Sequence, residues 1–413
     1  MTNKRKIIND PVYGFLTIED EIIFDIISHP YFQRERRIAQ LGFTTLVYPC
    51  ATHTRFSHML GALSLMNRAI EVLRVKGVEI GDEEALGVKL AILLHDIGHG
   101  PFSHISEHVL ADVDHEVLTL LFMERLNEEF HGALTMAIDI FTDSYRKHFL
   151  HQLVSSQLDM DRLDYLSRDS YFTGVCEGIV GTERIINMLN VHDDELVVDE
   201  KGIYSIEKFI ISRRLMYWQV YMHKTVIVAD NLLLSILRRA RQTGASSHNE
   251  SLDIFLRNHV READFRHDAS LLDRFARLDD SDITVAVKGW MQHDDVILRT
   301  LSTNLICRHL GAIRVSNQPF ASEVTDGYRQ QVQQRYGIDP QDSDYFVNTG
   351  ILRNHAYDFN DQEIKVLYKG GECRDISEAS DQLDRRFLEK QVTKYYLFHP
   401  KEIRLDPETG RLG

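Results

Sequence analysis

The chain is poor in cysteine, in long apolar runs and in positive charge, and each shortage excludes a class of protein. The four cysteines among 413 residues are widely spaced without a CxxC pair, which excludes a disulfide framework and a cysteine zinc motif and indicates a reducing compartment. No apolar run approaches the roughly 18 residues of a membrane span, and the charged start MTNKRKIIND lacks the apolar core of a signal peptide. The net charge of −15 argues against a general binder of nucleic acid or anionic membranes. We therefore expect a cytoplasmic protein.

Helical periodicity dominates what the sequence does contain. Apolar residues recur at spacings of three and four from residue 54 to about 76, which indicates an amphipathic helix. Further helices are expected at 19–27, 31–40, 82–95, 115–128, 131–141, 145–157, 159–171, 206–241 and 321–336. Short strands or hairpins are expected at 6–18, 194–205, 344–347, 363–368 and 394–398. We predict a mainly α-helical fold with minor β-hairpins: a core of residues 1–310 and a small mixed α/β appendage, residues 311–413.

The stretch AILLHDIGHGPFSH, residues 91–104, combines features that are costly to bury together. An apolar helical run ends in His95 and Asp96, and His99 follows one turn later. An imidazole and a carboxylate at the end of a buried helix need a partner, because a dry environment disfavours both unless they are paired or coordinated. The pair therefore indicates a divalent metal site.

Two more residues complete a candidate ligand set with this pair. His58 lies near the start of one expected helix and Asp161 near the start of another, so the proposed metal ligands are His58, His95, Asp96 and Asp161. Two imidazoles and two carboxylates suit Mn, Fe, Ni or Zn, and Mg remains an alternative although it prefers oxygen ligands alone. Such a site suits metal-assisted hydrolysis. Taken singly, His58 is better explained as a capping or surface histidine, and Asp161 as a helix-surface carboxylate.

These residues, in their surroundings, carry a resemblance to a known family. The segments NDPVYG, FQRERRIAQLG, HTRFSHMLG, LLHDIGHGPFSH, DHE, DMDRLDYLSRD and YMHK occur in this order over roughly residues 6 to 310. Together they resemble the HD-domain phosphohydrolases, and within these the deoxynucleoside triphosphate triphosphohydrolases. The match begins at the N-terminus, so we expect no SAM domain before it. The resemblance implies an HD-domain helical bundle and hydrolysis of a deoxynucleoside triphosphate to the deoxynucleoside and inorganic triphosphate.

The resemblance also assigns roles to individual residues. The catalytic positions of the family fall on His99 and His115, and the carboxylate that orients the catalytic histidine falls on Glu107, where close relatives have Asp. The implied substrate-binding residues contact the phosphates or the sugar: Gln40, Arg55, Arg162, Tyr165, Asp169, Arg213, Tyr221 and Lys224. Among these, Gln40 and Asp169 would hold the 3′-hydroxyl, and Tyr221 would close off the space of a 2′-hydroxyl and so reject ribose.

A regulatory nucleotide site is a further implication of the resemblance. Regulated relatives bind a guanine nucleotide at a subunit interface, and the matching positions are Lys6, Gln33, Arg34 and Arg36. The guanine-reading acidic residue falls on Ser28 here, which leaves open activation by another nucleotide or no activation. We expect a homo-oligomer, either a dimer or a tetramer.

Two alternatives remain at the level of the sequence. The same metal site could serve a nucleotide phosphatase or phosphodiesterase, although Arg162, Arg213 and Lys224 favour a longer phosphate chain. A nucleotide-sensing protein with a vestigial site is weakened because all four ligand positions and His115 are present.

Overall fold

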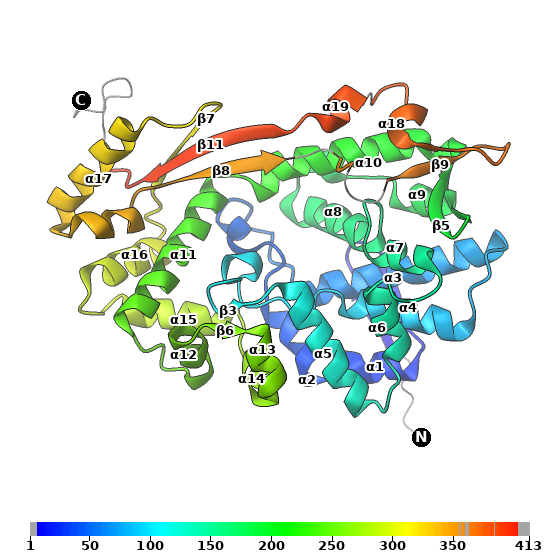
Figure 1. Ribbon diagram of the computed structural model, residues 1–413, viewed down its shortest axis with the longest axis horizontal. Helices are drawn as coiled ribbons and strands as arrows, with labels where there is room; N and C mark the ends of the chain where they lie inside the picture. Colours follow the sequence, from blue (N-terminus) through cyan, green and yellow to red (C-terminus); the bar gives the residue numbers. More distant parts are fainter. Residues whose placement is uncertain (1–5, 355–356, 360–362, 384, 404–413) are drawn as a thin grey trace.

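A bundle of helices forms the core of the molecule (Figure 1). The computed structural model describes residues 6–354, 357–359, 363–383 and 385–403. Helix α3 (Arg55–Val75) packs against α4 (Asp82–Leu94) and α8 (Met160–Thr173). The expected apolar positions of α3 are buried: Phe56, Met59, Leu60, Leu63, Met66, Ile70 and Leu73. The mainly helical fold is confirmed.

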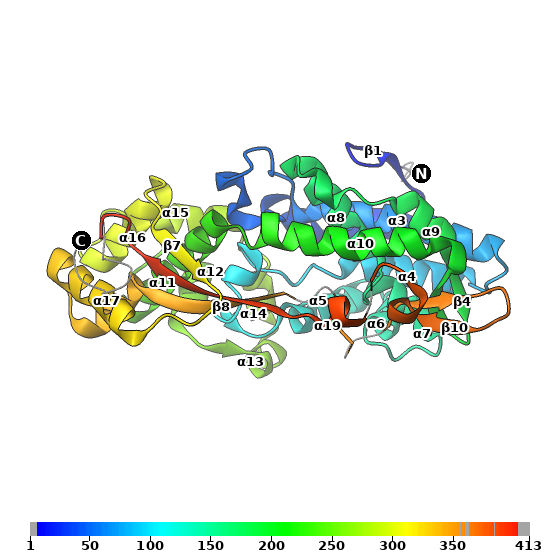
Figure 2. The same ribbon diagram turned by 90° about the horizontal axis from the view of Figure 1, so that it is seen from above.

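The remaining helices surround these three. They are α1 (Glu21–Ser28), α2 (Pro30–Arg34), α5 (His115–Glu129), α6 (Thr135–Phe141), α7 (His148–Val154), α9 (Thr182–Met188), α10 (Ile203–Met216), α11 (Lys224–Thr243), α12 (Glu250–Arg257), α13 (Glu262–His267), α14 (Ala269–Phe275), α15 (Asp280–Trp290), α16 (Val296–Ile306), α17 (Ser322–Tyr336), α18 (Ile376–Ala379) and α19 (Arg385–Glu389). Figures 1 and 2 show α15, α16 and α17 at one end of the molecule and α9 at the other.

Gly61 on α3 lets this helix approach α8 closely, near the predicted metal ligand His58. A Cβ atom at Gly61 would lie 2.0 Å from Asp164 Oδ1 and 2.1 Å from Arg168 Nη2. Both of those side chains are fully buried on α8. Because the contact involves a buried charged pair, no larger residue fits at position 61 without moving a helix.

The prediction of one continuous helix over 206–241 is wrong, because the structure has a break in this stretch. Helix α10 continues into a π-helical turn, Tyr217–Tyr221, and α11 starts at Lys224 with a bend of 57°. His223 adopts extended backbone and its ring accepts a hydrogen bond from the Thr225 amide, which caps α11. The break turns Tyr217 and Tyr221 toward a pocket.

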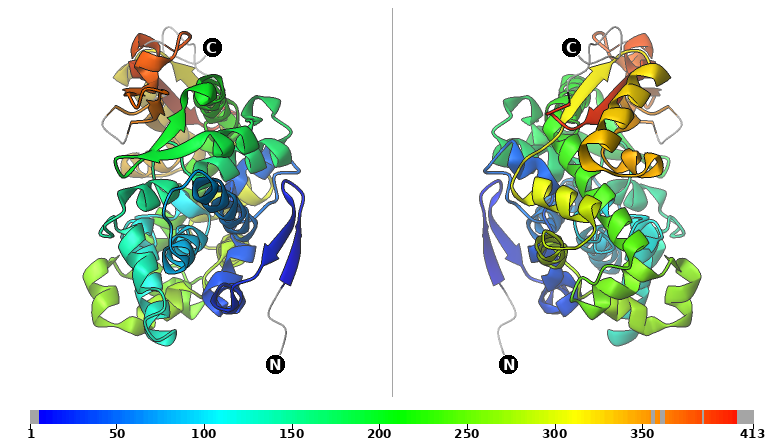
Figure 3. Two further views of the ribbon diagram at one scale, coloured as in Figure 1. Left: turned by 90° about the vertical axis from the view of Figure 1, so that its right-hand side faces the viewer. Right: turned by 90° about the vertical axis from the view of Figure 1, so that its left-hand side faces the viewer.

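The N-terminal hairpin stands at the side of the bundle (Figure 3). Strand β1 (Lys6–Asp10) pairs antiparallel with β2 (Gly14–Ile18), which confirms the hairpin expected at 6–18. Asp10 Oδ1 accepts the amides of Val12 and Tyr13, each at 2.9 Å, and Gly14 has φ +79°.

Two sheets involve the C-terminal part of the chain. Strands β7 (Ala312–Ser316), β11 (Val392–His399) and β8 (Asn348–Asn354) form one, in that order. The other has the order β10 (Cys373–Asp375), β9 (Lys365–Leu367), β5 (Glu195–Asp199) and β4 (Leu189–His192), so it joins strands from before and after residue 311. The short strands β3 (Ala111–Asp112) and β6 (Val260–Arg261) pair in parallel. The domain boundary near 311 stays a prediction.

Two strand predictions are corrected by local turn chemistry. The hairpin expected at 194–205 turns instead at Asp193 and Asp194, which both have positive φ, and residues after 199 are helical. The strand expected at 344–347 begins only at Asn348, as β8. Residues 344 and 345 end a 3₁₀ helix, Pro340–Tyr345, which Pro340 starts and in which Ser343 Oγ donates to the Pro340 carbonyl at 2.5 Å.

Among the described residues no single helix has the length and apolar character to cross a membrane. The bent pair 200–221 and 224–243 meets that test of length and composition only when the two parts are taken together.

Candidate functional site

Three helix ends bring the proposed metal ligands together. His58 lies in the first turn of α3, His95 directly follows α4, and Asp161 lies in the first turn of α8. The Nε2 atoms of His58 and His95 are 3.3 Å apart, and Asp161 Oδ1 lies 3.0 Å from the first and 3.4 Å from the second. Donor atoms that share a metal at about 2.1 Å lie about 3.0 to 3.4 Å apart. The three side chains therefore have the spacing of a first coordination shell.

Asp96 lies at the edge of this cluster. Its carboxylate oxygens are 3.5 Å from His95 Nε2 and 3.7 Å from His58 Nε2. The guanidinium of Arg55 is bonded to Asp96 and also donates to Ser103 Oγ at 2.8 and 2.9 Å. Burial works to raise the pKa of Asp96, but the charges of Arg55, His95 and His99 together hold that pKa well below its usual range. Asp96 is thus ionised and ready to act as a fourth ligand.

Buried partners fix the orientation of both imidazoles. His58 Nδ1 lies 2.7 Å from Asp164 Oδ2, and His95 Nδ1 donates to the Ile92 carbonyl at 2.7 Å. The Asp164 carboxylate is held in turn by two nitrogens of Arg168, at 2.9 and 3.0 Å. With Nδ1 occupied, both rings present Nε2 to the cluster, which is the arrangement that metal-binding histidines need.

The cluster already holds positive charge where a cation would sit. Burial works to lower the pKa of His58, but its hydrogen bonds to Asp161 and Asp164 raise that pKa to about 10. Burial works to raise the pKa of Asp161, and the hydrogen bonds from His58 and His95 hold it far below its usual value. A divalent ion would replace the proton of His58, so metal binding releases protons here.

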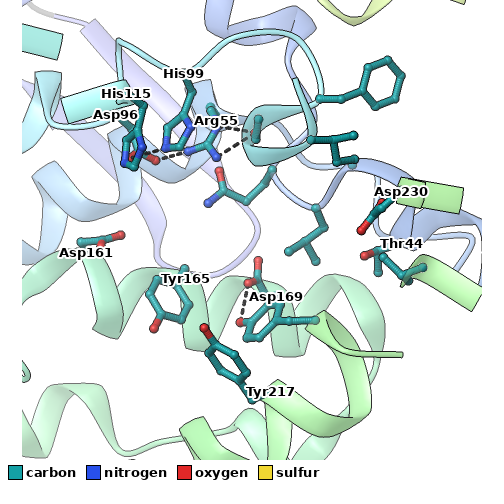
Figure 4. Close-up of a pocket in the computed structure, with 18 residues that line it drawn as sticks. Thr44, Arg55, Asp96, His99, His115, Asp161, Tyr165, Asp169, Tyr217 and Asp230 are labelled. Carbon is teal, nitrogen blue, oxygen red and sulfur yellow. Dashed lines mark hydrogen bonds and ion pairs between the residues drawn. The ribbon is translucent and has the colours of Figure 1, made fainter. Parts of the chain in front are cut away.

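A second histidine pair lies next to the cluster (Figure 4). The rings of His99 and His115 stack with centroids 4.0 Å apart. Glu107 Oε1 lies 2.9 Å from His115 Nδ1 and also accepts the His115 backbone amide at 2.9 Å. Burial works to lower the pKa of His115, but the hydrogen bond and charge of Glu107 raise it above its usual value. Burial and the charge of Arg55 hold the pKa of His99 well below its usual range, so the two rings favour opposite protonation states.

One cavity of about 390 Å³ joins both groups to the proposed sugar-binding residues. Its lining includes these predicted site residues: Gln40, Arg55, Asp96, His99, His115, Asp161, Tyr165, Asp169 and Tyr221. Tyr221 donates its hydroxyl to Asp169 Oδ2 at 2.7 Å, and His53 Nε2 lies 2.7 Å from Asp169 Oδ1. Asp169 is therefore held from both sides at the wall of the cavity. The volume suits a ligand of nucleotide size.

The comparisons with known proteins agree with this geometry. Residues 55–169 match the HD domain and residues 180–264 match the HD associated region. A crystal structure of a phosphohydrolase from Bacteroides thetaiotaomicron superimposes with a TM-score of 0.92 at 48% identity, over 96% of this chain and 99% of that one. The uncharacterized protein YwfO of Bacillus subtilis is 32% identical over 98% of this chain and 94% of its own length. This chain belongs to the HD-domain phosphohydrolases.

HD domains bind a divalent metal ion, and the cluster of His58, His95 and Asp161 fits one by its donor types and spacing.

A more distant relative carries a named activity. The deoxynucleoside triphosphate triphosphohydrolase SAMHD1 homolog of Dictyostelium discoideum is 32% identical, over 53% of this chain and 46% of its own length. The similarity thus extends to about half of each protein.

Three of the predicted phosphate contacts do not line the cavity. Arg162 lies on α8, where its Nε donates to Asp159 Oδ2 at 3.3 Å, and Arg213 lies in the last turn of α10. Lys224 is exposed at the first residue of α11. The charges of Arg213 and Arg162 both act on Tyr165, a cavity residue. Their contact with phosphates stays a prediction.

The predicted regulatory residues divide into exposed and buried groups. Lys6 and Arg36 are exposed, and Gln33 Nε2 donates to the Ile27 carbonyl at 2.6 Å. Arg34 is 1% exposed. Its guanidinium donates to Glu35 and to the carbonyls of Ile97 and His99, the latter two at 2.8 and 2.7 Å. The structure shows Arg34 holding the loop after the His95–Asp96 pair, and a nucleotide contact for it stays a prediction.

Several cavity residues escaped the sequence reasoning. Tyr217 was expected only as part of a long helix, and the π-helical turn that orients it has no clear sequence signal. His53 does not line the cavity itself but contacts Asp169, which does. It is the first residue of the family segment HTRFSHMLG, and nothing local distinguishes it from a surface histidine. Asp230 lines the cavity from α11, six residues after Lys224 at the start of that helix, and its sequence context is apolar.

Proposed function

We propose that this HD-domain phosphohydrolase cleaves deoxynucleoside 5′-triphosphates to the deoxynucleoside and inorganic triphosphate. The observation that carries the proposal is the continuity of the cavity. Asp161, a member of the metal cluster, lines it together with His115, Tyr221 and Asp169. A phosphate at the cluster would place the 5′-oxygen toward His115 and the sugar toward Tyr221.

The residues of the chain account for the chemistry in the following way. His58, His95, Asp96 and Asp161 would hold a divalent metal ion, which would polarise the phosphoryl group and lower the pKa of a nearby water. The water oxygen forms a bond to the α-phosphorus as the bond from phosphorus to O5′ breaks, and the proton that the water loses passes to solvent, from which His115 is protonated again after the reaction. The leaving O5′ takes a proton from His115, which Glu107 orients and keeps protonated near neutral pH. Arg55 stands beside Asp96 to stabilise developing negative charge.

Sugar selection would rest on Tyr221. Its hydroxyl is fixed on Asp169, so its ring cannot swing aside to admit a 2′-hydroxyl without breaking a buried hydrogen bond. The rings of Tyr165 and Tyr217 pack edge-on against it, with centroids at 6.2 and 5.5 Å. We therefore expect ribonucleotides to be poor substrates.

The decisive experiment incubates the metal-loaded protein with each dNTP and NTP and resolves the products by chromatography. We expect deoxynucleoside and triphosphate in equal amounts from dNTPs. Release of pyrophosphate or orthophosphate instead would overturn the proposal and favour a phosphatase or phosphodiesterase.

The Asp161→Ala variant, which lacks a proposed ligand, should lose both bound metal and activity. Retention of stoichiometric metal in this variant would remove Asp161 from the ligand set.

A further inference from the structure

The cavity has a second end, away from the metal cluster. Figure 4 shows Asp230 and Thr44 on the side opposite to Asp96, His99 and His115. Val226 also lines the cavity, and it lies one helical turn before Asp230 on α11, so both side chains share the face that borders the cavity. Tyr221, across the helix break, connects this end to the sugar-binding part.

Asp230 is an unusual residue for such a place. Its Oδ1 is shielded from solvent and has no hydrogen-bond partner among the described residues. Burial raises the pKa of Asp230 to about 7. A desolvated carboxyl group without a partner is destabilising, so it is retained where a ligand supplies the missing donors. The other carboxylates of the cavity are satisfied within the chain: Asp96 by Arg55, Asp161 by His58 and His95, and Asp169 by His53 and Tyr221.

We propose that Asp230 selects the nucleobase of the substrate, and that it favours a base that presents two adjacent N–H donors on one edge. This inference rests on the proposed function, since it takes the cavity as a nucleotide site. With the phosphates at the metal cluster and the sugar beside Tyr221, the base extends toward Asp230 and Thr44. The two oxygens of a carboxylate match two parallel N–H groups, as they do in a bidentate pair.

The four bases differ sharply in what they offer to a carboxylate. Guanine presents N1–H and the N2 amino group side by side. Adenine and cytosine each present one amino group next to a ring nitrogen that accepts, and thymine presents one N–H between two carbonyl oxygens. An acceptor directed at the carboxylate is repelled or left unpaired, which costs binding. Guanine is therefore the preferred base of this end of the cavity.

The test compares kcat/KM for dGTP, dITP, dATP and dTTP in the wild type, Asp230→Ala and Asp230→Asn. Hypoxanthine in dITP lacks only the N2 amino group of guanine. We expect the wild type to prefer dGTP over dITP by roughly tenfold or more, the size expected for one hydrogen bond to a charged group. Asp230→Ala should abolish this difference. Asp230→Asn, whose amide both donates and accepts, should shift the preference toward dATP.

A matched control removes a carboxylate elsewhere. Glu71→Gln on α3, whose side chain is 71% exposed, should leave all four ratios unchanged. Asp230→Asn should unfold at a temperature equal to or above that of the wild type, because it removes an unpaired buried acid. An equal preference for dGTP and dITP in the wild type, or a preference that survives Asp230→Ala, would overturn the assignment.

A binding measurement separates this inference from the proposed function. Equilibrium binding of dGTP and dITP is measured for the metal-free wild type and the Asp230→Ala protein. If no dNTP is hydrolysed but dGTP still binds more tightly and only with Asp230 present, the proposed function fails and the role of Asp230 stands. If dNTPs are hydrolysed and neither binding nor kcat/KM depends on Asp230, the proposed function stands and the role of Asp230 fails.

Discussion

Single side chains at the proposed metal site depend on buried partners that never contact the substrate. His58 faces the cluster through Nε2 because Asp164 occupies Nδ1, and Asp164 is fully buried beside Arg168. Without Asp164 the ring could take the other tautomer or rotate, and the lone pair directed at the ion would be lost. The strength of metal binding thus depends on Asp164, which contacts the ligand His58 and not the ion.

Asp164→Asn should weaken metal binding by about 10- to 100-fold, because an amide neither fixes the tautomer of His58 nor balances the charge of Arg168. The measurement is a competition titration of the purified protein with a chelator of known affinity. Glu71→Gln serves as the control for loss of an exposed carboxylate. Unchanged affinity in Asp164→Asn would show that His58 orientation does not limit binding.

Glu107→Gln should shift the pH dependence of activity toward acid. The general acid His115 must be protonated. Burial works to lower its pKa, but the hydrogen bond and charge of Glu107, together with the charges of Asp96 and Glu116, raise it above the usual value. Activity falls as pH rises through this pKa, so a lower pKa moves the alkaline limb of kcat to lower pH. The measurement is a pH profile of kcat at saturating substrate. An alkaline limb at the wild-type position would exclude His115, or its contact with Glu107, as the source of that limb.

At the scale of elements, the site depends on where helices end and how closely they approach. His95 follows α4, and both His58 and Asp161 lie in first turns, so small shifts of three helices would separate the ligands. Gly61 sets the distance between two of them, since any Cβ there would meet Asp164 and Arg168. The helix break at 217–223 sets a second distance, between the tyrosines and Asp169.

Gly61→Ala should destabilise the protein by about 2 to 3 kcal/mol and weaken metal binding, because the methyl group forces α3 away from α8. The matched control is Gly289→Ala on α15, where an added Cβ meets nothing within 4 Å. That change should stabilise the protein by about 0.5 to 1 kcal/mol. Chemical unfolding of the metal-free proteins measures both. Equal effects of the two substitutions would show that α3 and α8 can separate freely.

On the scale of the whole molecule, the N-terminal hairpin is linked to the metal ligands by a continuous set of buried charges. Asp10, which forms the hairpin turn, accepts from Arg168 Nη1 at 2.7 Å, and Arg168 holds Asp164 beside His58. On the same hairpin, Ile7 and Phe15 are 66% and 76% exposed. We propose that this surface takes part in a homo-oligomer, a dimer or tetramer, with a nucleotide as its regulator.

Phe15→Ser should lower the assembly state, because it removes a large exposed apolar side chain from the hairpin while the metal site stays intact. Sedimentation velocity at several protein concentrations, with and without added dNTPs, measures this. Metal content serves as the control for folding and should match the wild type. A wild-type protein that is monomeric under all these conditions would contradict the proposal.

The sequence alone determined the chemical type of the site. The apolar run that ends in His95 and Asp96, with His58 and Asp161 near expected helix starts, indicates a metal because such groups are costly to bury unpaired. The family resemblance assigned Glu107 as the carboxylate that orients the catalytic histidine, and the structure places it beside His115. The helical core followed from periodicity, since residues that face one side at a spacing of 3.6 must be buried together.

The tertiary structure decided where the long helix breaks and which partners the buried polar side chains have, because local sequence patterns do not encode either. The helix break before Lys224 depends on a π-helical turn, and the satisfied state of Asp169 depends on His53, which lies 116 residues away. Arg34 resembles a surface cation in sequence, yet it is buried against carbonyls of the loop after Asp96. Asp230 stands out only because no partner reaches it. Partners and their absence are properties of the packed chain, so they become visible only in three dimensions.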